Sequence, residues 1–108
     1  IIDVTWGGGI TFAKKAAAIA ESCKKSIAFH DCSGPITLVV STHLALACNN
    51  VIEQEITRGF FYSWYKDLVL NLPILKNGYI SLEALPGLGV KLNDDYLKNS
   101  NVIVRVSK

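Results

Sequence analysis

The chain has 108 residues, of which 50% are hydrophobic and 19% charged, so it suits one compact domain or part of one and not a disordered tail. Its 11 basic and 9 acidic side chains give a net charge of +2 and are scattered along the chain, so we expect no nucleic acid partner. The apolar runs are far shorter than the ~20 residues of a membrane-spanning helix, and we expect no membrane span.

The first half of the chain is predicted to alternate strands and helices. In chain order, its predicted elements are a strand end at residues 1–4, a helix capped by Thr11, a strand at 26–29, a helix at 36–48 and a strand at 51–56. This order is typical of the βα units of a parallel α/β fold. The second helix is apolar on nearly all sides, which predicts that most of its surface is buried.

The second half of the chain has a different character. An aromatic block at residues 60–65 is predicted to lead into a short helix that runs through Leu70, and we interpret its side chains as core or subunit contacts. A strand at 79–82, a helix at 94–98 and an alternating strand at 101–106 are predicted to follow.

Ionisable side chains stand where the three predicted strands of the first half end. They are Asp3, then His30, then Glu53 and Glu55. The carboxyl ends of parallel strands share one face, so we expect these side chains to meet there. An Asp that accepts the Nδ1 proton of a His fixes its tautomer, which leaves the other nitrogen as a positioned proton donor or acceptor. The pattern therefore indicates a general acid/base dyad.

Structural roles are open for the same residue types. Asp3 is also suited to cap the following turn, and His30 to be a hydrogen-bonded core residue. His43 lies in an apolar helix, where we interpret it as structural. Cys32 is interpreted as a buried thiol, not as a nucleophile, because no second histidine is placed to activate it.

The cysteines indicate a reducing compartment. Cys23, Cys32 and Cys48 are odd in number and lack CxxC spacing, which favours reduced thiols over a disulfide framework or a zinc knuckle. We therefore expect a cytoplasmic location. The chain starts at Ile1 and contains no Met, which leads us to expect a missing upstream part.

Four motifs resemble one known family in order and spacing. They are residues 3–11 (DVTWGGGIT), 30–35 (HDCSGP), 52–55 (IEQE) and 86–89 (PGLG). Together they resemble the C-terminal part of the mandelate racemase and muconate lactonizing enzyme family of the enolase superfamily, near its sugar-acid dehydratases. The resemblance implies the C-terminal portion of a TIM-type (β/α) barrel.

The resemblance also implies a domain division. Residues 1–58 would hold the last βα units of the barrel, from the end of strand 6 to strand 8. Residues 59–108 would be a C-terminal segment that packs on the barrel and on an absent N-terminal capping domain. A complete barrel needs ~250 residues, so the remainder would lie upstream.

By resemblance, the whole enzyme would be a magnesium-dependent acid-sugar dehydratase, a lyase that removes the proton α to a carboxylate and eliminates water. Asp3 would orient His30, the general acid or base, and Glu55 would hydrogen-bond the substrate carboxylate. Glu53 competes with Glu55 for that role because strand periodicity places both on one face. The magnesium ligands would lie upstream, with none in this chain.

Two alternatives remain open. One is a racemase or epimerase of a 2-hydroxy acid that uses the same dyad. The other is a catalytically inactive half-barrel, whose open sheet edges would pair with another fragment. We expect the isolated chain to be inactive, and the partners to be a small sugar-acid substrate, the missing N-terminal part and further copies in a homo-oligomer.

Overall fold

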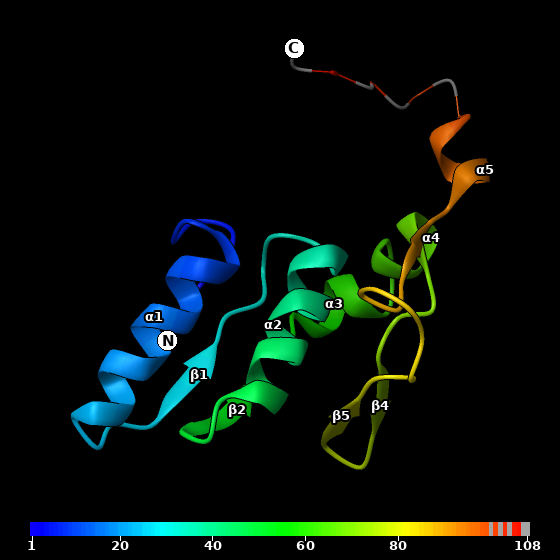
Figure 1. Ribbon diagram of the computed structural model, residues 1–108. Helices are drawn as coiled ribbons and strands as arrows, with labels where there is room; N and C mark the ends of the chain where they lie inside the picture. The colour runs from blue at the N-terminus through cyan, green and yellow to red at the C-terminus, as the bar shows by residue number, and fades with distance from the viewer. Residues whose placement is uncertain (100, 102, 104, 107–108) are drawn as a thin grey trace.

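The computed structural model of the chain describes residues 1–99, 101, 103 and 105–106 and has mixed helices and strands (Figure 1). The helices are α1 (Gly9–Ser22), α2 (Pro35–Ala47), α3 (Arg58–Phe61), α4 (Tyr65–Leu68) and α5 (Asp94–Leu97). The strands are β1 (Ile27–Phe29), β2 (Val51–Gln54), β3 (Val69–Leu70), β4 (Ile74–Lys76), β5 (Tyr79–Ser81) and β6 (Lys91–Leu92).

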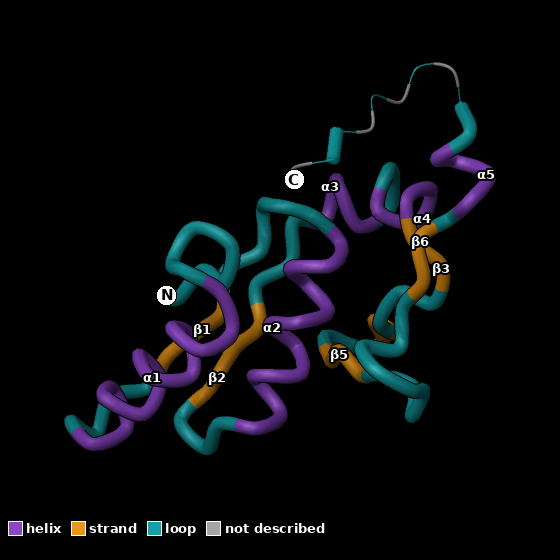
Figure 2. Tube along the Cα trace, turned by 45° about the horizontal axis from the view of Figure 1, so that its top comes forward, coloured by secondary structure: helices purple, strands orange, loops and turns teal. Residues whose placement is uncertain are grey.

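The first half forms a small parallel sheet. β1 pairs with β2 in parallel, and Ile2 forms an isolated parallel bridge to Phe29 on the other side of β1. The Ile2 N–H donates to the Ala28 carbonyl and the His30 N–H donates to the Ile2 carbonyl, both at 2.9 Å. Three chain segments therefore run in the same direction, as the alternating pattern predicts. Figure 2 shows β1 and β2 side by side.

Helices α1 and α2 connect these segments and enclose the first hydrophobic core. Ala13 and Ala17 of α1 are buried with Phe29 of β1 and with Val40 and Leu44 of α2. The small alanine side chains let α1 pack closely against the strand. The sequence pattern that separates the buried and exposed faces of α1 therefore positions the helix over the sheet.

The start of α1 corrects one prediction. The N-cap is Gly8, with φ of 109°, and not Thr11, which lies inside the helix. Gly8 and Gly9 both have positive φ, a conformation that glycine adopts without the strain a side chain would bring. The chain therefore enters the helix before Thr11 is reached. Pro35 occupies the first position of α2, where its missing N–H costs nothing.

The second half packs on α2 through another hydrophobic cluster. Leu38 of α2, Phe61 and Tyr65 are buried together, and the β4–β5 hairpin contributes Leu75 and Ile80. β4 and β5 pair antiparallel, as do β3 and β6. The aromatic block therefore supplies core contacts, as the sequence indicates.

One prediction for the second half differs from the structure, and another includes residues outside the described ones. The single helix expected through Leu70 is instead α3, α4 and then the short strand β3, because Val69 turns extended, with φ of −131°, and pairs with β6. The strand expected at residues 101–106 includes residues 102 and 104, which lie outside the described residues. Among the described helices, none is long and apolar enough to cross a membrane.

Candidate active site

Three side chains follow directly after the three parallel segments. Asp3 comes after Ile2, His30 comes after β1 and Glu55 comes after β2. The Glu55 N–H donates to the Phe29 carbonyl at 2.9 Å, which continues the pairing of the two strands as far as these residues. All three residues therefore stand at one edge of the sheet, as the sequence predicts.

Asp3 and His30 are in direct contact. Nδ1 of His30 lies 2.6 Å from Oδ2 of Asp3, and the side chains are 30% and 15% exposed. The other carboxylate oxygen, Oδ1, accepts the Trp6 N–H at 2.7 Å. With both oxygens engaged, the carboxylate has a fixed orientation and holds the imidazole ring.

The turn after Asp3 leaves no room for a side chain at Gly7. The Gly7 N–H donates to the Asp3 carbonyl at 3.1 Å. A Cβ at this position would lie 2.5 Å from the same carbonyl oxygen, which is closer than real contacts allow. The glycine therefore lets the chain turn tightly enough to bring the Trp6 N–H onto the Asp3 carboxylate.

The contact moves both pKa values in opposite directions. The hydrogen bond to Asp3 raises the pKa of His30 above its ordinary value; partial burial opposes this, and the nearby Glu55 carboxylate adds to it. Partial burial works against ionisation of Asp3, but the hydrogen bonds from His30 and from backbone N–H groups outweigh it and lower the pKa of that carboxyl. The pair therefore favours an imidazolium beside a carboxylate.

Glu55 lies on the other side of the imidazole. Its Oε2 is 3.6 Å from Nε2 of His30 and accepts the Asp31 N–H at 3.3 Å. Glu53 instead pairs with Ala28, further back along β1, and lines a pocket beside the β4–β5 hairpin. Among the described residues, Glu55 is therefore the glutamate that the structure brings to the imidazole.

A buried carboxylate that the sequence analysis does not single out lies behind His30. Asp31 is 1% exposed and accepts two hydrogen bonds, from the Tyr65 hydroxyl at 2.8 Å and from the Thr57 N–H at 2.9 Å. The Thr57 hydroxyl also donates to the Asp31 carbonyl. These contacts join the ends of β1 and β2 to α4 and thereby fix the distance between His30 and Glu55.

The remaining histidine and the cysteines lie in different surroundings. Nε2–H of His43 donates to the Leu88 carbonyl at 3.1 Å, a contact between α2 and a loop of the second half. All three cysteines are unpaired. Cys32 is exposed, contrary to the burial expected, because it lies on the loop after β1, with its Sγ 3.7 Å from Nδ1 of His30.

The described residues do not fit a magnesium ion. Mg²⁺ requires a near-octahedral set of oxygen ligands. Among the described residues, one cluster could hold a metal ion, with one donor atom each from Asp3, His30 and Cys32. Only the carboxylate supplies an oxygen ligand, whereas the imidazole supplies nitrogen and the thiol supplies sulfur. This set suits softer cations than Mg²⁺.

The geometry suits proton transfer at Nε2 of His30. Asp3 holds the ring through Nδ1, so Nε2 is the nitrogen left to exchange a proton with a molecule at the sheet edge. The neighbouring Glu55 carboxyl can contact the same molecule. The site therefore resembles an acid/base centre in which His30 exchanges a proton with a bound molecule and Glu55 contacts that molecule through a polar group.

Comparisons with known proteins show that the chain is similar to part of several longer proteins. The family model described as "Enolase C-terminal domain-like" matches residues 1–96. A D-galactonate dehydratase of Xanthomonas campestris pv. campestris is 37% identical over 105 residues, which are 92% of this chain and 27% of that protein. The chain thus spans about a quarter of the length of such relatives.

Solved structures share the fold. An enolase protein from Sargasso Sea environmental DNA aligns with a TM-score of 0.85 and 39% identity over 95% of this chain and 27% of its own. An enolase from Pantoea ananatis with bound D-gluconate and magnesium aligns with a TM-score of 0.76 and 27% identity, covering 87% of this chain and 23% of its own.

Proposed function

The chain belongs to the enolase C-terminal domain-like family, in the mandelate racemase and muconate lactonizing enzyme group, and from this membership we propose that it is the C-terminal part of a magnesium-dependent acid-sugar dehydratase. The observation that carries the proposal is the contact of 2.6 Å between Asp3 and His30, with Glu55 at 3.6 Å, at the ends of adjacent parallel segments. The similarity to D-galactonate dehydratases supports an aldonic acid as substrate.

His30 is the proposed acid of the elimination. After a base on a part of the enzyme outside this chain has taken the α-proton, the C3–O bond breaks and Nε2–H of His30 protonates the departing hydroxyl, which leaves as water. The product enol then tautomerises to a 2-keto-3-deoxy acid. For the opposite epimer, neutral His30 takes the α-proton at Nε2 instead. The raised pKa of His30 favours the first role, because it keeps the imidazole protonated.

Asp3 and Glu55 have supporting roles in this scheme. Asp3 accepts a hydrogen bond from Nδ1–H of His30 and so keeps that proton on Nδ1. Nε2 is therefore the nitrogen that faces the substrate, whether the imidazole is neutral or charged. Glu55 contacts a polar group of the substrate beside the imidazole, since its Oε2 lies 3.6 Å from Nε2 of His30. The backbone contact from Asp31 holds Glu55 in place for this interaction.

Other parts of the enzyme would supply the residues that bind the metal. The donor set of the described residues does not suit magnesium, so we assign the magnesium ligands to residues upstream of this chain. The Pantoea ananatis structure, which contains magnesium and D-gluconate, supports a magnesium-dependent reaction for the whole enzyme.

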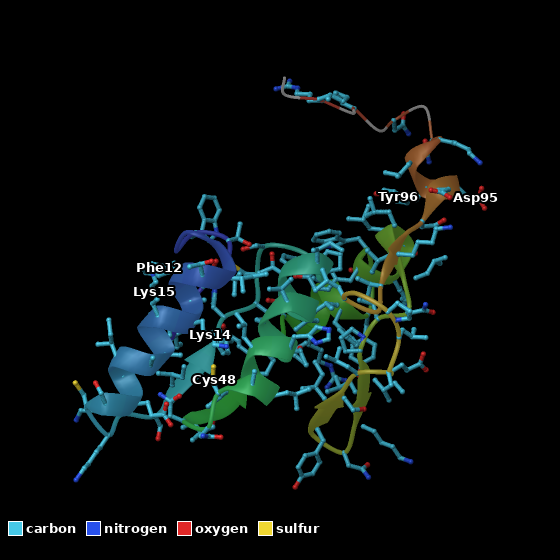
Figure 3. The ribbon with its side chains drawn as sticks, viewed as in Figure 1. Phe12, Lys14, Lys15, Cys48, Asp95 and Tyr96 are labelled. Atoms are coloured by element: carbon cyan, nitrogen blue, oxygen red, sulfur yellow. The ribbon has the colours of Figure 1, made fainter. Side chains whose placement is uncertain are left out.

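The exposed apolar face of α1 supports a larger barrel. Phe12 and Ile19 are 49% and 67% exposed, and Figure 3 shows Phe12 and Lys15 on the side of α1 away from α2, with Lys14 and Cys48 on the side toward it. We assign this face to contact with preceding barrel units. We likewise retain residues 1–58 as the last barrel units and residues 59–108 as the segment that meets a capping domain.

A kinetic comparison tests the function. The chain is expressed together with its upstream coding sequence, and the product is assayed with Mg²⁺ on a panel of aldonic and aldaric acids. His30→Asn should lower kcat by ~10²- to 10⁴-fold, the usual contribution of one general acid or base. His43→Asn is the matched control, because that imidazole binds a loop carbonyl. Undiminished turnover by His30→Asn would refute the assignment.

The same assay separates elimination from racemisation. A dehydratase releases one keto acid for each acid consumed. A racemase or epimerase would exchange the α-proton with solvent deuterium and return an acid that still carries its 3-hydroxyl. Exchange without keto-acid formation would favour that second activity.

A further inference from the structure

The Cys32 thiol stands beside the Asp3–His30 pair and has no part in the proposed reaction. Its Sγ lies 3.7 Å from Nδ1 of His30, and Oδ2 of Asp3 lies 2.6 Å from the same nitrogen. One donor atom from each of the three residues falls within 4.8 Å of the other two. Three different donor types therefore converge on one point at the edge of the sheet.

The spacing is close to that of a tetrahedral metal centre. Bonds of ~2.3 Å to sulfur and ~2.0 Å to nitrogen or oxygen place nitrogen and sulfur ~3.5 Å apart, and nitrogen and oxygen ~3.3 Å apart. The observed nitrogen–sulfur distance of 3.7 Å already fits. The carboxylate would have to retreat by about 0.7 Å from the observed 2.6 Å, a small movement for a side chain that is partly exposed.

We propose that Asp3, Nδ1 of His30 and Sγ of Cys32 form a binding site for a borderline-soft divalent cation of the Zn²⁺ type, with water in the fourth position. The residue types select this cation class, because thiolate and imidazole bind Zn²⁺ and similar ions well and Mg²⁺ poorly. Two of the donors lie within three positions on one loop, so one short segment presents them together.

The cation and the dyad proton exclude each other. Metal on Nδ1 takes the place of the proton that His30 shares with Asp3, and Cys32 binds as the thiolate. Binding to the imidazolium form therefore leaves a neutral imidazole with its proton on Nε2 and releases two protons to solvent. Zinc should thus inhibit an enzyme that uses this pair for acid/base chemistry, a consequence that rests on the proposed function, whereas the metal site itself does not.

A cobalt titration of the 108-residue chain tests the site directly. Co²⁺ is the probe, because its tetrahedral complexes absorb in the visible and its thiolate bond gives a charge-transfer band in the near ultraviolet. The chain, reduced without thiol reagents, should develop both absorptions up to one equivalent of Co²⁺, and Zn²⁺ should remove them. A folded chain without these bands would overturn the proposal.

Cysteine variants identify the ligand. Cys32→Ser should abolish the charge-transfer band and weaken Zn²⁺ binding by more than the ~10- to 100-fold cost of losing an outer-shell partner. Cys23→Ser and Cys48→Ser are matched controls and should keep the band, since neither thiol belongs to the group. His30→Asn should also lose the tetrahedral spectrum. Persistence of the band in Cys32→Ser, with circular dichroism showing a folded chain, would refute the site.

The whole enzyme tests the inhibition separately. With Mg²⁺ saturating, the activity of each variant in the presence of Zn²⁺ is divided by its own activity without Zn²⁺. This ratio should fall for the parent enzyme and for Cys23→Ser and should recover in Cys32→Ser. If the enzyme shows no dehydratase activity, the proposed function fails while the cobalt spectrum still decides the metal site. Equal ratios in Cys32→Ser and the parent would refute the inhibitory role.

Discussion

Replacing Tyr65 by Phe removes the hydroxyl that donates to Asp31 while keeping the aromatic ring in the core. Tyr65 is fully buried, its hydroxyl lies 2.8 Å from Oδ1 of Asp31, and Asp31 is itself 1% exposed. Water cannot readily replace the missing donor at such a site. A hydrogen bond to a charged group contributes ~1.5 to 3 kcal/mol, and we expect Tyr65→Phe to reduce the free energy of unfolding by about that amount.

Urea denaturation of the chain, followed by tryptophan fluorescence, measures this loss. With an m-value of ~1 to 3 kcal/mol per molar urea, a loss of ~2 kcal/mol lowers the unfolding midpoint by ~1 M. Tyr79→Phe is the control, since Tyr79 is 79% exposed, and its effect should stay within ~0.5 kcal/mol. A midpoint for Tyr65→Phe equal to that of Tyr79→Phe would show that the buried hydrogen bond does not stabilise the fold.

The same variant changes the response to alkali. Burial, reinforced by the bond to Asp31, raises the pKa of Tyr65 above its ordinary value of 10.0. The unfolded chain therefore loses this phenolic proton before the folded chain does. Stability from Tyr65 is complete below about pH 10 and falls as the pH rises, by up to about 1.4 kcal/mol per pH unit. Tyr65→Phe should lose stability less steeply with pH above 10, and an unchanged slope would contradict this account.

The other two predictions concern the Asp3–His30 pair, and both are measured with a chelator present. Asp3→Asn should lower the pKa of His30, followed by the NMR titration of its ring protons, because the hydrogen bond to Asp3 is the main cause of the raised value. In the parent chain, stability from this contact is complete between about pH 3.8 and 6.5; it is lost as the pH rises through the raised pKa of His30 and as the pH falls through the lowered pKa of Asp3. A His30 pKa that is unchanged in Asp3→Asn would contradict the geometry. Gly7→Ala should destabilise the chain by ~1 to 3 kcal/mol in urea, because its Cβ would press on the Asp3 carbonyl, whereas Gly59→Ala, with open space around it, should not. Equal unfolding midpoints for the two alanine variants would show that the turn relaxes freely.

Much of the first half could be predicted because local patterns determine it. The α/β fold, as the C-terminal portion of a TIM-type barrel in the enolase superfamily, is confirmed by the family match and the structural alignments. Apolar periodicity locates α1, α2 and the strands to within a few residues. Asp3 and His30 meet because each directly follows a parallel segment, and this is a rule of topology that needs no coordinates.

The second half and the buried carboxylate could not be predicted in this way. An aspartate after a strand is usually a solvated turn residue, and nothing near Asp31 in the sequence indicates that Tyr65, 34 residues later, will cover it. The choice between Glu53 and Glu55 also needs coordinates, since both share one periodicity and only pairing with β1 brings Glu55 to His30. The prediction for the start of α1 is wrong because Thr11 is a typical capping residue, whereas the sequence does not show that Gly8 and Gly9 adopt positive φ and begin the helix earlier.

The Asp31 carboxylate makes the two halves of the chain interdependent. One oxygen takes the hydroxyl of Tyr65 on α4, and the other takes the N–H of Thr57 just after β2. If α4 detaches, the Asp31 carboxylate loses the Tyr65 hydroxyl as a donor. A buried carboxylate with an unsatisfied oxygen costs free energy, which destabilises the neighbouring sheet edge. Opening of the aromatic segment should therefore also open the sheet edge that positions His30 and Glu55. We expect the amide hydrogens of these two regions to exchange as a single cooperative unit.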